Sequence, residues 1–175
     1  MEIRITKAAE SDFSAIRSFY HAVIDQMQNS QYDIGWKKDI YPEPGFLTDS
    51  IKKGELYICT DSDGIEAAMV LNHEYLEAYR DVSWQTDADE SGILVIHILG
   101  VHPKKSRQGF GKAMVGHAVR LAASSGLAAV RLDVLPGNLP AEELYMQQGF
   151  SYIATRSVYY EDVGWADMNL YEYVI

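Results

Sequence analysis

Residues 101 to 112 read V-H-P-K-K-S-R-Q-G-F-G-K and stand between two stretches of different pattern. The stretch before them, I-L-V-I-H-I-L-G-V at 93–101, is an almost unbroken apolar run, which predicts a central strand buried on both faces. After them, apolar residues recur at helical spacing from Phe110 to Ala122. The segment is therefore predicted to be the loop that leaves a strand and enters a helix.

A loop of this kind is suited to binding an anion. The first amides of a helix have no partner within the helix, and the helix dipole adds partial positive charge at the same point. Gly109 and Gly111 would let phosphate approach the backbone without a Cβ in the way. The surrounding cations are Lys104, Lys105, Arg107 and Lys112. A solvated basic turn, whose glycines serve only the backbone geometry, is the alternative interpretation.

Two common phosphate motifs are excluded by single positions. A Walker A loop would need Ser or Thr after Gly-Lys, where the chain has Ala113. A dinucleotide fingerprint would need glycine where the chain has Met114.

The rest of the chain predicts a mixed α/β fold in a single domain over 1–175. Strand, helix and strand from 93 to 134 form a βαβ unit, which predicts parallel pairing of its two strands. We expect further strands at 2–6, 55–60, 65–72, 150–160 and 165–174, and further helices at 13–27, 46–53 and 140–148. Residues 29–45 are predicted to be an aromatic loop, and residues 75–91 have no assignable pattern.

Composition limits the function classes. The 25 acidic and 15 basic residues give a net charge of −10, which disfavours nucleic acid and anionic membranes as partners and slightly favours an amine. No apolar stretch is long enough for a membrane helix, no signal sequence is present, and the lone Cys59 lies in an apolar run. We therefore expect a cytoplasmic protein with Cys59 in its core.

The segment V-H-P-K-K-S-R-Q-G-F-G-K-A-M resembles the acetyl-CoA pyrophosphate loop of the GNAT superfamily of N-acetyltransferases, whose usual core is [QR]-x-x-G-x-[GA]. Gly109 and Gly111 match that core, whereas Ser106 departs from it. A second block, N-L-P-A-E-E-L-Y-M-Q-Q-G-F at 138–150, is similar to the family's N-x-x-A-x-x-[LF]-Y-x-x-x-G-F. The resemblance covers about residues 93–150 and implies a GNAT-like fold of six to seven strands, with the parallel central strands splayed apart.

The resemblance also implies an acyl donor and the residues that bind it. Backbone amides of the loop would bind the pyrophosphate of acetyl-CoA, backbone groups near Leu99 and Val101 would bind the acetyl carbonyl and pantetheine, and Asn138 would contact the CoA arm. Gly100 is expected to mark the bulge that opens the slot between the strands. The expected loop contacts are Ser106, Arg107, Gln108, Gly109, Phe110, Gly111 and Lys112.

Acetyl transfer to an amine needs an acid for the leaving thiolate and a base for the ammonium. By resemblance Tyr145 protonates the sulfur, although a core aromatic is the alternative. His97 is the first candidate for the base, because strand alternation places it on the face of Leu99 and Val101. Asp133 and Glu74 are alternative bases or ammonium anchors.

The acceptor is expected to be a small-molecule or peptide amine against a wall formed by Tyr32, Trp36 and Tyr41, since aromatic faces bind cations. The histidines and Cys59 show no metal-ligand spacing, so no metal is expected. Apolar residues on the last two strands could form a homodimer. Two other functions stay open: a noncatalytic CoA-binding sensor or interaction module, and transfer of a longer acyl group.

Overall fold

The computed structural model describes residues 3–32, 34–160 and 164–175. These residues form two compact units. Unit 1 contains the described residues up to Leu71 together with His97–His117, and unit 2 contains Asn72–Ile96 together with the described residues from Ala118 onward. Two continuous elements run through both units: β4 (Ile93–Val101) and α3 (Phe110–Ser124). The single domain over 1–175 stays a prediction.

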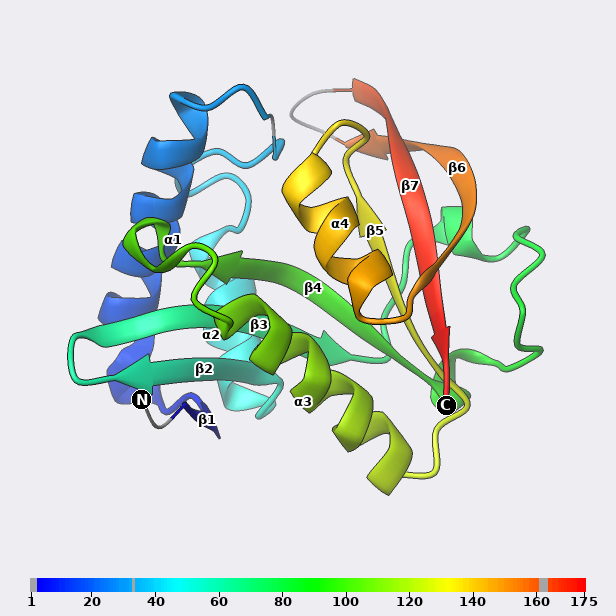
Figure 1. Ribbon diagram of the computed structural model, residues 1–175, viewed down its shortest axis with the longest axis horizontal. Helices are drawn as coiled ribbons and strands as arrows, with labels where there is room; N and C mark the ends of the chain where they lie inside the picture. The colour runs from blue at the N-terminus through cyan, green and yellow to red at the C-terminus, as the bar shows by residue number, and fades with distance from the viewer. Residues whose placement is uncertain (1–2, 33, 161–163) are drawn as a thin grey trace. The chain divides into compact units, whose positions relative to one another are not determined.

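Unit 1 combines an antiparallel sheet with two helices (Figure 1). Strands β1 (Arg4–Lys7), β2 (Leu56–Asp61) and β3 (Gly64–Asn72) pair in that order, and β2 and β3 are joined by a tight turn. The helices are α1 (Phe13–Gln28) and α2 (Pro44–Lys52). Pro44 occupies the first turn of α2, where its missing N–H costs nothing.

A core of its own holds unit 1 together. Ile16, Phe19 and Tyr20 of α1 are almost fully buried, as their helical spacing predicts. They belong to the same buried cluster as Leu56 of β2 and Val70 of β3. The amphipathic pattern of the first helix is thereby explained by burial of one face.

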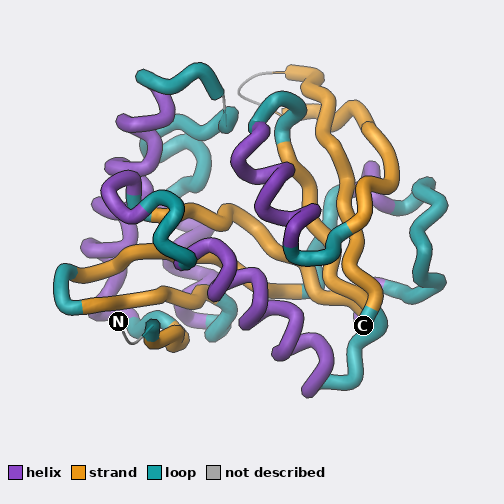
Figure 2. Tube along the Cα trace, viewed as in Figure 1, coloured by secondary structure: helices purple, strands orange, loops and turns teal. Residues whose placement is uncertain are grey.

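Unit 2 contains the first part of β4 followed by β5 (Ala129–Val134), α4 (Leu139–Gln147), β6 (Ser151–Tyr160) and β7 (Gly164–Val174). β4 and β5 pair in parallel over 93–95 and 129–131, and β7 lies antiparallel between β5 and β6. Figure 2 shows the long β6–β7 pair as two adjacent strands. The parallel register extends from Ile93 to Val95, although both strands continue beyond it.

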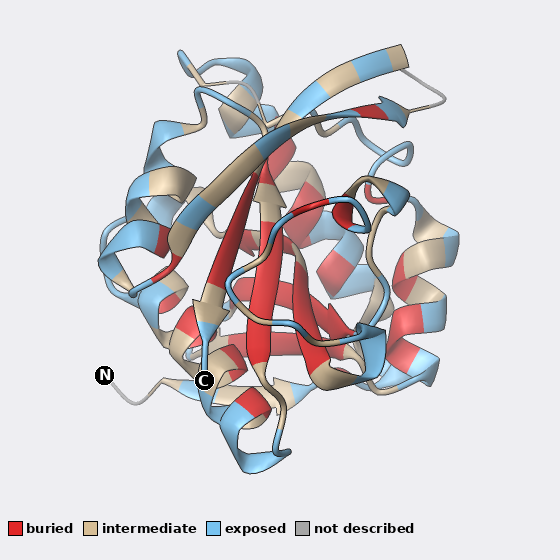
Figure 3. Ribbon diagram, turned by 90° about the vertical axis from the view of Figure 1, so that its right-hand side faces the viewer, coloured by how far each residue is buried: buried red, intermediate tan, exposed pale blue. Residues whose placement is uncertain are grey.

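The hydrogen-bonded order of the strands is β1-β2-β3-β4-β5-β7-β6. This mixed sheet of seven strands with flanking helices confirms the predicted α/β class, and the parallel β4–β5 pair confirms the predicted βαβ unit. Figure 3 shows buried residues gathered on the central strands and exposed residues on the outer faces of the helices.

The segment 75–91, which shows no sequence period, is part of the core of unit 2. Tyr79 in the short 3-10 helix η2 (Glu77–Tyr79) is 1% exposed, and Val82 is 9% exposed. Both belong to a buried cluster that includes strand residues such as Ile93 and Leu170. Because this segment is mostly irregular backbone, its packing could not be read from periodicity.

Among the residues that the structure describes, no helix is long and apolar enough to cross a membrane.

Candidate active site

The loop between β4 and α3 has the backbone that an anion site requires. It begins with the 3-10 turn η4 (Pro103–Lys105), whose first amides are capped by the His102 side chain, which accepts from the Lys104 N–H at 3.3 Å. Arg107 and Gly109 then adopt positive φ angles of 61° and 91°. The Gly109 carbonyl accepts the Ala113 N–H at 2.9 Å, so α3 begins here and its first amides lie at the loop.

The reason for glycine at position 109 is its backbone angle. A Cβ built there would meet nothing within 4 Å, but its φ of 91° lies in a region that side chains with a Cβ rarely adopt. The residues from Ser106 to Gly109 are exposed, whereas Phe110 is 1% exposed and seats the first turn of α3. The loop is therefore exposed to solvent from Ser106 to Gly109 and is anchored at its end by the buried Phe110.

The cations of this loop do not all remain available to an anion. Lys104, Arg107 and Lys112 are exposed. Lys105 instead directs its Nζ to Asp61 at 2.8 Å and to Asp63 at 2.9 Å. Local sequence placed Lys105 beside the phosphate site, but its ammonium pairs with the β2–β3 turn.

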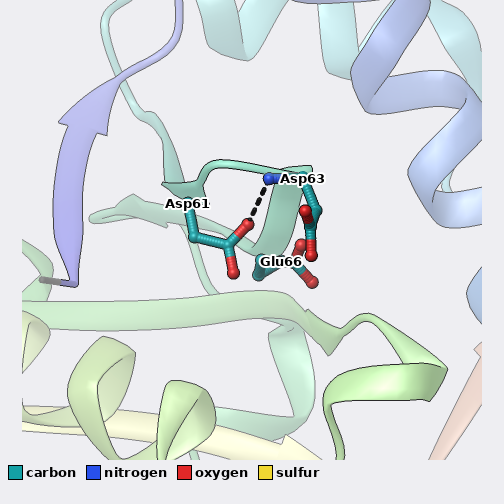
Figure 4. A group of neighbouring side chains, drawn as sticks. All are labelled: Asp61, Asp63 and Glu66. Atoms are coloured by element: carbon teal, nitrogen blue, oxygen red, sulfur yellow. Dashed lines mark hydrogen bonds between the residues drawn. The ribbon is translucent and has the colours of Figure 1, made fainter. Parts of the chain in front are cut away.

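Sequence reasoning missed the acidic group to which Lys105 binds. Asp61, Asp63 and Glu66 converge from the two ends of the β2–β3 turn (Figure 4), and their carboxylate oxygens lie within 4.8 Å of one another. Among the residues that the structure describes, these three carboxylates are close enough to one another to ligate one metal ion. The three residues stand close together in the sequence, in D-S-D-G-I-E at 61–66.

The second half of β4 carries the predicted base and the backbone expected to bind the thioester. His97, Leu99 and Val101 are partly buried while Ile98 and Gly100 are buried, so burial alternates along the strand as predicted. Ile98 has a φ of 47°, an uncommon angle for a β-branched residue. The expected irregularity is thus at Ile98, and Gly100 does not have a positive φ.

Two aromatic rings lie beside Gly100, at the distance of ordinary van der Waals contact from a Cβ at that position. A Cβ there would lie 3.4 Å from the Phe19 ring and 3.6 Å from the Trp36 ring. The Tyr20 hydroxyl donates to the Ile98 carbonyl at 3.0 Å, which satisfies a buried acceptor at the irregular position. Trp36 of the aromatic loop and Phe19 and Tyr20 of α1 therefore lie against β4.

The loop 29–45 is held to α1 by ion pairs. Asp39 accepts two hydrogen bonds from Arg17, at 2.8 and 2.7 Å, and its Oδ1 lies 2.9 Å from His21 Nε2. Hydrogen bonds from Arg17 and then His21 hold the pKa of Asp39 well below its usual range. Loop residues near Asp39 thus keep a defined position on α1.

Of the three predicted wall residues, two gather around Tyr20. Trp36 lies edge-on to the Tyr20 ring at 5.8 Å, and Tyr41 is close enough to contribute, after burial itself, to raising the pKa of Tyr20. Tyr41 is 39% exposed. Tyr32 differs, since its hydroxyl accepts from the neighbouring Gln31 at 2.7 Å.

Tyr145 lies on α4 in unit 2. It is 6% exposed and packs edge-on against Phe150 at 5.6 Å. Burial, with a smaller contribution from the charge of Asp133, raises the pKa of Tyr145 well above its usual range. The phenol therefore keeps its proton throughout the physiological range.

Asp133 at the end of β5 has a partner that the sequence did not reveal. Tyr79 donates its hydroxyl to Asp133 Oδ2 at 2.5 Å, and Tyr79 is stacked on Tyr75 at 5.3 Å. Glu74, the other carboxylate predicted here, is exposed, and its backbone N–H donates to Asn72 Oδ1 at 3.0 Å. Unit 2 thus brings Tyr145, Asp133 and Tyr79 together.

Asn138 begins α4 through its backbone rather than its side chain. Its carbonyl accepts from Ala141 at 3.0 Å and from Glu142 at 3.1 Å, but its side chain makes no capping hydrogen bond. A plain N-cap role does not account for asparagine at this position.

The sequence profile described as "Acetyltransferase (GNAT) family" matches residues 22–150. The chain belongs to this family. It is a GNAT acetyltransferase, an enzyme class that uses acyl-CoA as the donor, and the match extends well upstream of the two motif blocks into α1.

Solved structures share the fold at low identity. An acetyltransferase of the GNAT family from Listeria monocytogenes 4b F2365 is 18% identical with a TM-score of 0.76, over 100% of this chain and 96% of that one. The Escherichia coli ribosomal-protein-S18-alanine N-acetyltransferase is 18% identical with a TM-score of 0.68, over 99% and 94%. Arabidopsis thaliana NAA60 in complex with acetyl-CoA is 18% identical with a TM-score of 0.72, over 99% and 100%.

These likenesses confirm the GNAT fold. A comparison with curated protein sequences finds no match.

Proposed function

We propose that the GNAT acetyltransferase described here transfers the acetyl group of acetyl-CoA to a primary amine by direct attack in a ternary complex. The observation that carries the proposal is the β4–α3 loop, with positive φ at Arg107 and Gly109 and the first amides of α3 beside exposed cations. Backbone amides of residues 106–112 bind the pyrophosphate, because a helix N-terminus favours negative charge.

The thioester binds beside the second half of β4. Backbone groups at Leu99 and Val101 hold the acetyl carbonyl and the pantetheine, and Asn138 contacts the CoA arm. This role is supported by the observation that the Asn138 side chain makes no capping hydrogen bond to its helix.

The reaction replaces the carbon–sulfur bond of the thioester by a carbon–nitrogen bond, and proton transfers accompany this exchange. His97 takes the proton of the acceptor ammonium, the amine nitrogen forms a bond to the acetyl carbon, and the carbon–sulfur bond breaks. Tyr145 donates its hydroxyl proton toward the departing sulfur, and the acylated nitrogen loses its second proton to solvent, from which the Tyr145 phenolate recovers a proton. Burial raises the pKa of this phenol, which keeps it protonated and so present as a donor when the thiolate develops.

The acceptor is a small-molecule or peptide amine. Trp36 and Tyr41 form an aromatic wall that can hold a cation by the ring faces. Asp133 is the second candidate for the base or for the ammonium anchor, and its short hydrogen bond with Tyr79 supports a defined carboxylate position.

A thiol-release assay across a panel of small amines and peptides with free N-termini tests the function. We expect release with at least one amine class and a product heavier by one acetyl group. A product that carries a longer acyl group would mean that the donor is a longer acyl-CoA. Binding of acetyl-CoA without thiol release in the presence of any amine would favour a sensor.

The pH profile of the same reaction tests the base. We expect kcat/KM of the wild type to fall at acidic pH, because a protonated His97 cannot accept a proton. His97→Gln should lower the rate by roughly a hundredfold and remove that acidic limb, whereas Asp133→Asn should retain it. The titration of the amine itself is common to all three proteins. An acidic limb that persists in His97→Gln would transfer the role to Asp133 or water.

A further inference from the structure

The Lys105 ammonium lies in a partly closed acidic cluster. Its Nζ is 2.8 Å from Asp61, 2.9 Å from Asp63 and 3.7 Å from Glu66. The Lys105 side chain is 18% exposed, and those of Asp61 and Glu66 are 9% and 4% exposed. The Asp63 side chain is 68% exposed, but the contacts of Lys105 with Asp61 and Glu66 are sheltered from solvent and are screened less than the exposed pairs of a protein surface.

The cluster depends on Lys105 for compensation of its charge. Glu66 Oε2 is buried without a hydrogen-bond partner, and burial together with Asp61 raises the pKa of Glu66. Hydrogen bonds to Asp61 and Asp63 raise the pKa of Lys105, so its ammonium stays charged. Without that ammonium, three carboxyl groups within 4.8 Å of one another would lose the cation that lies between them.

The same contacts fix the position of the phosphate loop. Lys105 is the last residue of η4, and the N–H of His102, just before η4, donates to the Glu66 carbonyl at 2.7 Å. Both ends of η4 are thus held to the β2–β3 hairpin, one at Glu66 of β3 and the other at Asp61 and Asp63. The next part of the loop is bonded to η4 in turn, since Gln108 donates its backbone N–H to the Lys105 carbonyl and its side-chain N–H to the Lys104 carbonyl.

We propose that Lys105 is a positioning residue for acetyl-CoA: by pairing with Asp61, Asp63 and Glu66 it holds the loop that precedes α3, rather than contacting phosphate itself. This role rests on the proposed function, because the loop it holds is the one assigned to the pyrophosphate. A preordered loop binds more tightly because less conformational freedom is lost on binding.

Replacement of Asp61 distinguishes this role from a direct phosphate contact, because the two predict opposite changes in the affinity for acetyl-CoA. If Lys105 were a phosphate ligand, Asp61→Asn would release it and leave acetyl-CoA binding unchanged or tighter. As a positioning residue it loses a partner, so Asp61→Asn should raise the Kd and the KM for acetyl-CoA roughly three- to tenfold with kcat unchanged. Lys105→Met should act in the same direction, and Lys105→Arg should restore most of the affinity.

A matched control is Asp25→Asn, which makes the same chemical change in the exposed pair of Asp25 on α1 and Lys38 in the loop 29–45. This variant should leave both the Kd for acetyl-CoA and the KM unchanged. Tighter or unaltered binding in Asp61→Asn would overturn the proposal.

Hydrogen exchange of the ligand-free protein tests the positioning independently of acetyl-CoA. Amides in a peptide covering residues 103–112 should exchange faster in Asp61→Asn than in the wild type or Asp25→Asn. Unchanged exchange in this peptide, even with a lower Tm, would mean a purely structural ion pair and would overturn the role. If the wild type failed to bind acetyl-CoA, the proposed function would fall, while the exchange data would still decide whether Lys105 orders the loop.

Discussion

Tyr145→Phe is expected to lower kcat roughly a hundredfold or more while changing the affinity for acetyl-CoA by no more than about twofold. The substitution removes the hydroxyl and keeps the ring, so the packing against Phe150 is preserved. The loss therefore falls on the step in which the thiolate departs. Single-turnover kinetics together with calorimetric titration of acetyl-CoA would separate the two quantities.

The pH dependence of the wild type gives an independent check on Tyr145. Burial, followed by the charge of Asp133, raises the pKa of its phenol, so the protonated donor persists as the pH rises past the ordinary tyrosine pKa of about 10. Loss of the Tyr145 proton should therefore cause no fall in kcat below that pH.

Tyr152→Phe is the matched control for Tyr145→Phe. It removes a hydroxyl from a tyrosine on β6 that is 52% exposed, and we expect kcat to stay near the wild-type value. A wild-type kcat in Tyr145→Phe would refute the role of general acid and leave Tyr145 as a core aromatic.

The second large effect concerns stability, at the buried pair of Arg131 and Glu172. Their side chains are 2% and 0% exposed, with Arg131 Nε 3.0 Å from Glu172 Oε1. Glu172 Oε2 also accepts the backbone N–H of Gln85 at 2.7 Å, and Arg131 donates to the Thr86 carbonyl at 2.7 Å. The guanidinium lies 4.2 Å from the Trp84 ring.

Glu172→Gln should lower the free energy of unfolding by roughly 3 to 5 kcal/mol, because it leaves a buried guanidinium without its counter-charge. For a chain of this size that corresponds to a Tm lower by roughly 6 to 20 °C. Chemical denaturation followed by fluorescence would measure the free energy, and calorimetry would measure the Tm.

Glu90→Gln makes the same change in an exposed pair, since Glu90 lies 3.2 Å from Arg80 with side chains that are 48% and 57% exposed. It should cost less than about 1 kcal/mol. Equal effects of Glu172→Gln and Glu90→Gln would show that the buried pair contributes nothing beyond a surface contact.

Most elements could be predicted from local sequence because their signals are local. The helical spacing of residues in α1 and the apolar run of β4 correspond to the burial that the structure shows. The family resemblance added the order of the blocks around the β4–α3 loop, and the family match confirms it.

The features that escaped prediction depend on residues far apart in the chain. The segment 75–91 is held by Arg131 and Glu172, which come from β5 and β7. Lys105 pairs with Asp61 across 44 positions, and Tyr79 pairs with Asp133 across 54. No periodic pattern records such pairings, so local sequence indicates only that Lys105 is one of the cations around the glycine loop.

The pyrophosphate loop has a matched glycine control at the other end of α3. Gly109 and Gly126 have φ angles of 91° and 68°, and a Cβ at either would meet nothing within 4 Å. Replacement by valine should strain both positions by about 1 to 3 kcal/mol. Only Gly109→Val would also displace the amides assigned to phosphate.

Calorimetric titration of the purified protein with acetyl-CoA is the most direct test of the proposed donor site. We expect one acetyl-CoA per chain with a Kd between about 1 μM and 1 mM, the range of ordinary enzyme substrates. Binding should be abolished in Gly109→Val and retained in Gly126→Val. Absence of binding to the wild type, or equal binding by both valine variants, would contradict the assignment of this loop to the pyrophosphate of acetyl-CoA.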